Sequence, residues 1–133
     1  MRKNTVSYEK FHNSTSVQTK VITKNNFTYK IILEVIEDFI NSSKNILDIG
    51  SGAGTLCLYY ASKGYNVFGI DVSRKAVDSA NKSAEYLGFK NAKFRKMNFP
   101  QESPKERYDF IVFTEVIEHL EDDYLALKKI FSL

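Results

Sequence analysis

Residues 45–54 read Asn-Ile-Leu-Asp-Ile-Gly-Ser-Gly-Ala-Gly, and this stretch decides the fold. Its first half is apolar apart from Asp48, which is typical of a strand buried on both faces of a parallel sheet. Gly50, Gly52 and Gly54 follow at alternate positions, where a backbone without Cβ atoms can turn sharply and approach a ligand closely. We predict a strand, a glycine-rich loop and a helix, whose N-terminus would present unpaired N–H groups to a polar ligand.

Segments of helical and strand character alternate along the rest of the chain. Apolar residues at helical spacing alternate with short apolar runs, and Gly or Ser residues separate the two kinds of segment. Such alternation indicates βαβ units and an open parallel sheet, and therefore an α/β fold. The expected elements are strands over 45–50, 66–72, 92–97 and 108–114, and helices over 28–40, 54–63, 73–87 and from about 121 onward.

The first 26 residues differ from the rest in composition. We interpret 1–26 as a loose, polar lead-in with a short helix near Ser7–Phe11, and 27–133 as one domain. Residues 1–30 carry six basic side chains and one acidic, a net charge of +5. A basic arm can contact RNA or another anion. We favour the alternative, a solvated leader, because aromatic residues do not alternate with the basic ones.

The C-terminal end also departs from the usual pattern. The strand over 108–114 is apolar throughout and would lie at an unprotected sheet edge, and the chain stops on apolar residues. Natural sheet edges are usually charged or covered. We therefore expect that later strands are missing and that the sequence is a C-terminally truncated fragment.

Two acidic residues point to a nucleoside ligand. Asp71 ends the second strand, 17 residues after Gly54, where a carboxylate can accept hydrogen bonds from both ribose hydroxyls. Its alternative role is to cap the next helix beside Ser73. Thr55 stands where a dinucleotide fingerprint requires Gly or Ala, which argues against a nicotinamide cofactor. Asp48 lies in an apolar strand, and a buried acid is costly without a partner. The ammonium group of a cofactor would be such a partner.

At this point the sequence resembles a known family. ILDIGSGAG (46–54) followed by GIDVS (69–73) is similar to the first two motifs of class I S-adenosylmethionine-dependent methyltransferases. YDFIVFTEVIEHLEDD (108–123) resembles the fourth-strand motif of the subgroup (methyltransferase type 11) that contains the ubiquinone and menaquinone methyltransferases. The resemblance implies a Rossmann-like three-layer α/β/α sandwich that binds S-adenosylmethionine and methylates an O, N or C nucleophile of a small molecule.

The resemblance also implies a role for individual residues. Asp48 would orient the ammonium of the cofactor, Asp71 would bind the ribose, and Val72 would lie against adenine. Asn98 stands where the family usually has an acid for the adenine amino group, and its carbonyl oxygen can still accept that hydrogen bond. Met97 and Phe99 would flank adenine or belong to the core. The full expected cofactor set is Asp48, Gly50, Ser51, Gly52, Gly54, Asp71, Val72, Met97, Asn98, Phe99 and Thr114.

The segment after the fourth strand has two interpretations. If it is helical, Glu115, Glu118 and His119 share one face and could bind a divalent cation. That pattern resembles the metal-binding segment of RNA 3′-end 2′-O-methyltransferases. We favour the alternative without a metal, in which His119 packs beneath the cleft and the two acids are capping or solvated. Either Glu115 or His119, both near the methyl-transfer cleft, could act as a general base.

Three functions remain open on the sequence alone. They are a small-molecule methyltransferase, which we favour, a metal-dependent RNA 2′-O-methyltransferase, and a cofactor-binding fragment without catalysis. The single cysteine, Cys57, has the apolar surroundings of a buried structural thiol, and together with the lack of a membrane-length apolar run this fits a cytoplasmic protein. The sequence predicts neither the methyl acceptor nor the oligomeric state.

Overall fold

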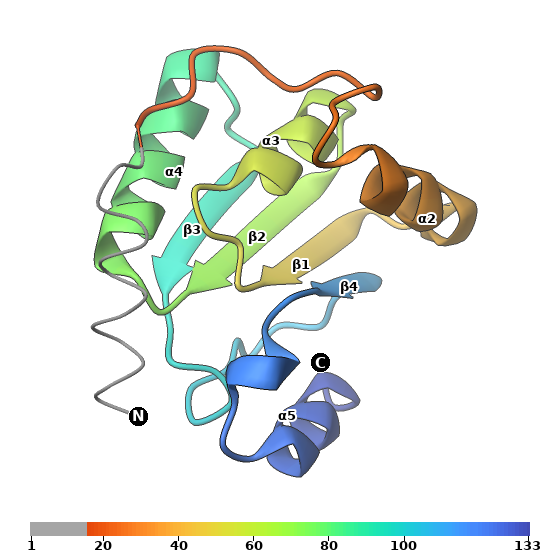
Figure 1. The fold of residues 1–133 in the computed structure, drawn as a ribbon, viewed down its shortest axis with the longest axis vertical. Helices are drawn as coiled ribbons and strands as arrows, with labels where there is room; N and C mark the ends of the chain where they lie inside the picture. Colours follow the sequence, from red (N-terminus) through yellow and green to blue (C-terminus); the bar gives the residue numbers. More distant parts are fainter. Residues whose placement is uncertain (1–15) are drawn as a thin grey trace.

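The computed structural model describes residues 16–133, and its centre is a four-stranded parallel sheet (Figure 1). The strand order is β3-β2-β1-β4. The strands are β1 (Asn45–Ile49), β2 (Asn66–Asp71), β3 (Ala92–Lys96) and β4 (Phe110–Phe113). Each lies within a range that the sequence predicts, so the α/β fold with a parallel sheet is confirmed.

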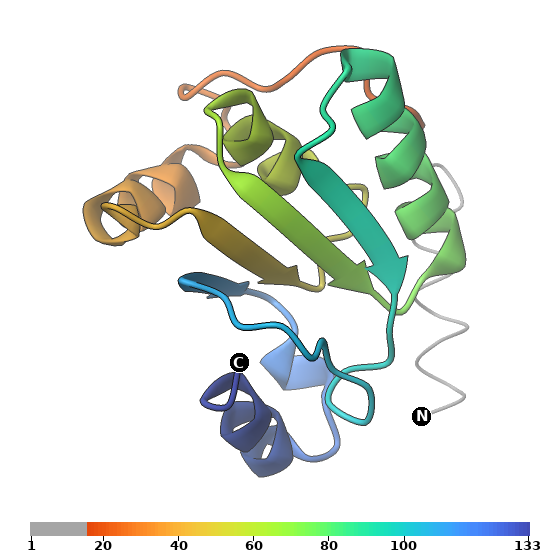
Figure 2. The same cartoon turned by 180° about the vertical axis from the view of Figure 1, so that it is seen from behind.

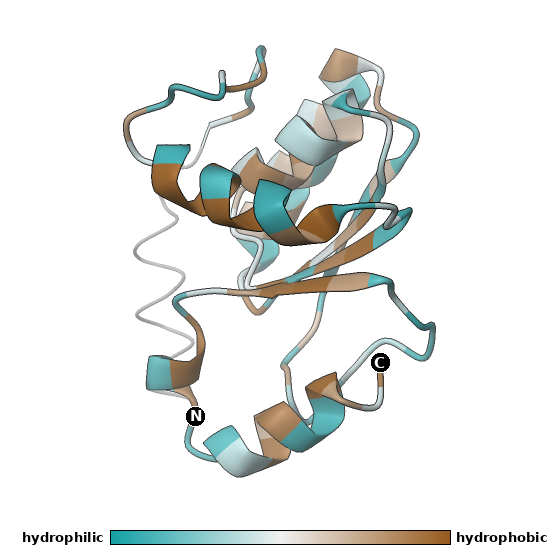
Figure 3. Cartoon of the chain, turned by 90° about the vertical axis from the view of Figure 1, so that its right-hand side faces the viewer, coloured by the Kyte–Doolittle hydropathy of each residue, from teal (hydrophilic) through white to brown (hydrophobic). Residues whose placement is uncertain are grey.

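Helices cover both faces of this sheet and complete three layers (Figure 3). One face carries α2 (Lys30–Ile40), α3 (Thr55–Ser62) and α4 (Arg74–Leu87). The other face carries the short 3₁₀ helix η2 (Ile117–His119) and α5 (Asp123–Ile130). The Rossmann-like α/β/α sandwich is therefore confirmed.

The apolar residues of β1 serve two cores, one on each face of the sheet. Ile46 belongs to the core beneath α2, α3 and α4, whereas Leu47 and Ile49 belong to the core on the α5 side. All three side chains are almost fully buried. Because both faces are covered, the strand is apolar on both sides except at Asp48. This residue alternates with Leu47 and so faces the same layer as Ile46.

The ends of α4 follow the capping rules that predict them. Ser73 precedes the helix, and its Oγ accepts the N–H of Ala76 at 3.2 Å. Gly88 follows the helix with φ +74°, the left-handed conformation that commonly ends helices. These local signals, rather than the apolar pattern alone, fix the helix boundaries.

Residues 18–22, in the N-terminal segment of the described chain, contact the domain. The backbone N–H of Gln18 donates to Ser83 Oγ in α4 at 2.8 Å, and Val21 and Ile22 pack against the core on the helical face. The sequence does not reveal these contacts, because residues 16–26 show no periodic apolar pattern. The short helix expected near residues 7–11 lies outside the described residues.

β4 occupies one edge of the sheet (Figure 2). Within residues 16–133 its only strand partner is β1. Asp109 fixes the start of this pairing, because its Oδ2 accepts the N–H groups of both Lys44 and Asn45 at 2.9 Å. These two backbone hydrogen bonds hold the pKa of the Asp109 carboxyl below its usual value.

Across the described range 16–133, every helix is too short or too polar to cross a bilayer.

Candidate functional site

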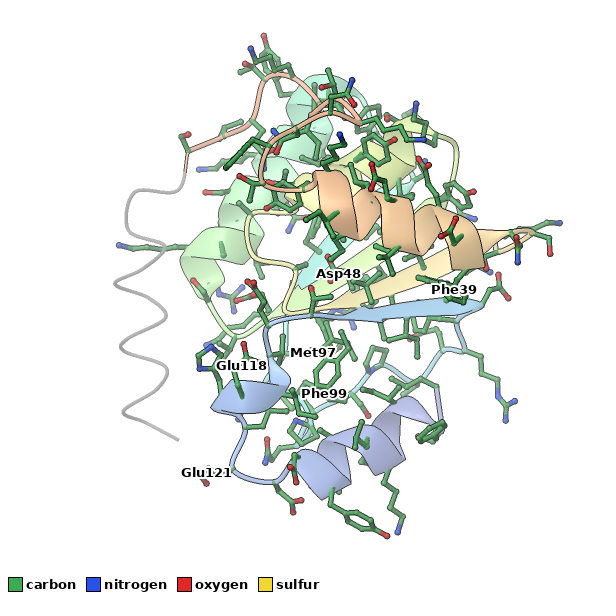
Figure 4. All side chains as sticks on the ribbon, turned by 45° about the vertical axis from the view of Figure 1, so that its right-hand side comes forward. Phe39, Asp48, Met97, Phe99, Glu118 and Glu121 are labelled. Carbon is green, nitrogen blue, oxygen red and sulfur yellow. The ribbon has the colours of Figure 1, made fainter. Side chains whose placement is uncertain are left out.

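A cavity of about 690 Å³ opens at the carboxyl ends of the strands. Its walls come from the glycine-rich loop after β1, the ends of β2, β3 and β4, the segment around η2, and Tyr29 and Ile32 beside and within α2. Figure 4 shows Asp48 on the side of β1 that faces α2. Met97, Phe99 and Glu118 lie on the opposite side, near η2. The cavity has the volume of a typical small-molecule site and lies where ligands bind open α/β sheets.

The structure brings nearly all the sequence-predicted site residues to this one cavity. The predicted residues that line it are Asp48, Gly50, Ser51, Gly52, Asp71, Val72, Met97, Asn98, Phe99, Thr114, Glu115, Glu118 and His119. Gly54 is the exception, because it is buried behind the loop. A Cβ at Gly54 would lie 2.6 Å from Cζ of Phe94, and its φ is +80°, so this glycine serves the packing of the loop on β3.

Backbone hydrogen bonds hold the glycine-rich loop against the end of β2. The N–H groups of Gly50 and Ser51 both donate to the carbonyl oxygen of Ile70, at 2.8 and 3.0 Å. The N–H of Gly52 donates to Oδ2 of Asp71 at 2.9 Å. The loop is therefore shaped before any ligand binds, which lowers the ordering cost of binding.

Asp71 accepts backbone hydrogen bonds at the start of α4 and also faces the cavity, where its ribose role stays a prediction. Its Oδ1 accepts the N–H of Ser73 at 2.8 Å, and its Oδ2 accepts the N–H of Gly52. The side chain lines the cavity with only 8% exposure. A carboxylate has about four lone-pair sites, so both oxygens can accept a further hydrogen bond from a ligand.

Asp48 is a buried carboxyl group beside the glycine-rich loop. Its residue is 5% exposed, and within residues 16–133 the hydrogen bond it receives comes from the Cys57 thiol, with Sγ 3.4 Å from Oδ2. Burial raises the pKa of Asp48 to about 7, the nearby charge of Asp71 adds to this, and the thiol bond opposes it. A cation in the cavity would stabilise the ionised form.

Cys57 is a buried thiol, as the sequence suggests. Burial, together with the neighbouring Asp48 carboxyl, raises the pKa of Cys57 well above its usual value. A thiol that stays protonated is a poor nucleophile, so the side chain of Cys57 acts as a small packed group and a donor to Asp48.

The glycine-rich loop also contains a buried hydroxyl, which lies 2.7 Å from the position that a Cβ on Gly69 would take. Ser51 Oγ is buried and has no hydrogen-bond partner in the part of the chain that the structure describes. Such atoms are costly unless water or a ligand satisfies them. Asp48, a buried acid that lines the cavity, fits a ligand that brings a cationic group to the loop, as the ammonium-bearing cofactor would.

The segment after β4 lacks the helical face that a metal site would need. Glu115 has φ +55°, and only Ile117–His119 form a single 3₁₀ turn. The helical premise is therefore wrong, because the left-handed backbone at Glu115 breaks the i, i+3, i+4 arrangement. Glu118 Oε1 and His119 Nε2 lie 3.8 Å apart, and no cluster of three potential metal ligands forms anywhere in residues 16–133.

Several apolar residues of the cavity wall carry no signal in the sequence. Tyr29, Ile32, Val116 and Leu120 line the cavity. Val116 Cγ2 occupies the position that a Cβ on Gly50 would need, so it explains why the loop requires glycine there. In the sequence these residues have the same appearance as core residues, and only the fold shows that they face a cavity.

Comparison with known proteins identifies relatives for the region that carries this site. A family model described as a methyltransferase domain matches residues 40–133. A 23S rRNA (uracil(747)-C(5))-methyltransferase from Pyrococcus abyssi is 43% identical over 74 residues, covering 56% of this chain and 17% of that protein. A ubiquinone biosynthesis O-methyltransferase from Bradyrhizobium sp. is 36% identical over 81 residues, covering 61% of this chain and 32% of that protein.

A solved structure with the same fold supports the comparison. Magnesium protoporphyrin IX methyltransferase from Synechocystis, with bound SAH, superimposes with a TM-score of 0.69 at 22% identity, over 98% of this chain and 63% of that one. The chain thus spans about a third or less of the length of the two curated relatives.

Proposed function

The chain belongs to the class I S-adenosylmethionine-dependent methyltransferase family, and we propose that its protein methylates an O, N or C nucleophile of a small molecule. The observation that carries this proposal is the cavity that gathers the glycine-rich loop, Asp48 and Asp71 at the carboxyl ends of the strands. Bound S-adenosylmethionine supplies a methyl group already activated on a sulfonium. The role of the chain is to bind and orient the reactants and to exclude water.

The proposed roles follow from the lining of the cavity. Asp48 orients the ammonium of the cofactor. Asp71 accepts hydrogen bonds from the ribose hydroxyls through its remaining lone pairs. Val72 and Asn98 contact adenine, with Met97 and Phe99 as apolar walls. Ser51, Gly50 and Gly52 lie along the methionine portion, where a small backbone allows close approach.

Glu115 is our leading candidate for a general base on the acceptor side. It lines the cavity at the end of β4 with Thr114, and its φ of +55° is uncommon for a residue other than glycine. Strained conformations of this kind concentrate at functional sites. His119 lines the same side of the cavity and is the alternative base.

The charge of the cavity favours a small molecule over RNA. Carboxylates line the acceptor side, and none of the lysine or arginine residues within 16–133 is part of the wall. RNA-binding sites need basic groups that neutralise phosphates. Although the relatives include an rRNA methyltransferase, this wall supports the small-molecule reaction.

Calorimetric titration with S-adenosylhomocysteine tests the cofactor assignment. We expect a single binding site on the folded protein, and no binding would overturn the proposal. Transfer of labelled methyl groups to candidate small molecules, with and without EDTA, tests the reaction. Activity lost on chelation would support the metal-dependent alternative, and binding without any transfer would support a cofactor-binding fragment.

The raised pKa of Asp48 predicts that cofactor affinity depends on pH. Below pH 7 the carboxyl is protonated and cannot pair with the ammonium, whereas above pH 7 it is ionised and can. We therefore expect the Kd for S-adenosylhomocysteine to be roughly tenfold higher at pH 6 than at pH 8. Asp48→Asn should bind more weakly and lose most of this dependence. An unchanged pH profile in the variant would contradict the role of Asp48.

We also propose that the protein works in the cytoplasm. Cys57 is buried, packed against Asp48 and without a second cysteine, which suits a reducing compartment. Fractionation of cells that express the tagged protein checks this location.

A further inference from the structure

We propose that Gln18 is a positioning residue for the cofactor. It lies outside the cavity and holds one peptide of the glycine-rich loop in the orientation that binds the cofactor. The inference rests on the proposed function, because the loop matters only if it binds the cofactor. It gives the docked N-terminal segment a part in the site, although this segment carries no recognisable motif.

The Gln18 side chain contacts both ends of the turn into α3. Its Nε2 donates to the carbonyl oxygen of Ala53 at 3.0 Å, and its Oε1 accepts from Oγ1 of Thr55 at 3.2 Å. Gln18 is half-buried and does not line the cavity, whereas Ala53 and Thr55 do. It therefore acts on the cofactor through the loop.

These contacts fix the orientation of one peptide plane. The Ala53 carbonyl and the Gly54 N–H belong to the same planar peptide. Gln18 holds the carbonyl, and the carbonyl oxygen of Ser51 holds the N–H at 2.9 Å. A flip of this peptide would break both hydrogen bonds. In a loop with glycine at alternate positions few steric barriers oppose a flip, so the hydrogen bonds select the conformation.

Gln18 is itself anchored to a rigid element. Its backbone N–H donates to Oγ of Ser83, which is fully buried in α4 and donates in turn to the carbonyl oxygen of Ser79 at 2.8 Å. Gln18 thus ties the loop, through its side chain, to α4, through its backbone. Because only the correctly shaped loop binds, the apparent affinity falls with the fraction of molecules that have that shape.

Gln18→Met tests the inference, because methionine keeps the length of the side chain and removes both hydrogen bonds. We expect the Kd for S-adenosylhomocysteine to rise roughly threefold to tenfold, the effect of losing one or two modest hydrogen bonds. Amide hydrogen exchange at Gly54 and Thr55 should become faster. Lys20→Ala, an exposed neighbour in the same segment, is the matched control and should bind like the wild type.

Gln18→Glu separates the two side-chain contacts. Glutamate can still accept from Thr55, but it cannot donate to the Ala53 carbonyl and repels it. We expect this variant to bind at least as weakly as Gln18→Met, and wild-type affinity would overturn the role of the Ala53 contact.

The outcomes distinguish this inference from the proposed function. If the wild type fails to bind S-adenosylhomocysteine, the proposed function is wrong. If the wild type binds and Gln18→Met binds equally well but melts at a lower temperature, Gln18 has a structural role only and the inference is overturned. If Gln18→Met does not fold, Gln18→Glu tests the side-chain contact to Ala53, and Ser83→Ala tests the anchoring of the Gln18 backbone to α4.

Discussion

Replacing Asp71 with alanine is expected to raise the Kd for S-adenosylhomocysteine at least about 100-fold, because two hydrogen bonds to a charged group together contribute about 3 kcal/mol or more. The same change leaves the N–H groups of Gly52 and Ser73 without their acceptor. We therefore also expect a lower melting temperature. Asp78→Ala, which removes an exposed acid from α4, is the charge-matched control and should change neither quantity.

The loss of affinity at Asp71 has two possible origins, which a modified ligand separates. The 2′-deoxy analogue of S-adenosylhomocysteine lacks one of the hydroxyls that Asp71 is proposed to bind. The wild type should prefer the natural ligand, whereas Asp71→Ala should bind both ligands equally weakly. If the variant kept the full preference, the effect of Asp71 would come from the shape of the loop alone.

Gly54→Ala is expected to have the largest effect on stability. The new methyl group would lie 2.6 Å from Phe94 Cζ and 3.1 Å from Ala80 Cβ, in a core where both neighbours are buried. Overpacking of this kind costs about 1–3 kcal/mol. The left-handed φ of +80° adds about 1–2 kcal/mol for a residue with a Cβ. We therefore expect the free energy of unfolding to fall by about 3 kcal/mol.

Gly64→Ala provides a matched control for the backbone contribution. Gly64 has φ +94°, and no atom lies within 4 Å of the position its Cβ would take. Its substitution should cost only the backbone strain, about 1–2 kcal/mol. Urea unfolding of both variants measures the difference. If both variants lose the same free energy of unfolding, Phe94 moves aside to make room for the new methyl group. If Gly54→Ala loses more, adding Phe94→Leu should restore part of its stability.

The fold follows closely from the sequence because its signals are local and agree with one another. The apolar run ending at Ile49 is buried on two faces, and Ser73 and Gly88 mark the ends of α4 through their own backbone and side-chain chemistry. The cavity could also be predicted in outline. Parallel strands bring their carboxyl ends together, so Asp48, Asp71 and Thr114 meet there although they are far apart in the chain.

What the sequence could not predict depends on non-local or irregular geometry. The left-handed backbone at Glu115 breaks a stretch whose spacing suits a helix, and no residue type marks it. Gly54 has the same place in the motif as its neighbouring glycines, yet it packs on Phe94 instead of facing the cavity. Gln18 gave no signal, because one polar side chain in a polar segment shows no period.

The docking of Gln18 also has a consequence for the order in which the chain folds. Its partners Thr55 and Ser83 lie 37 and 65 residues further along the sequence. During synthesis residues 16–26 leave the ribosome before α4, so Gln18 cannot dock until α4 has been made. The entropy of closing such long loops is lost before their contacts stabilise the chain. We therefore expect this segment to be the last part to settle and the first to be cut by a protease.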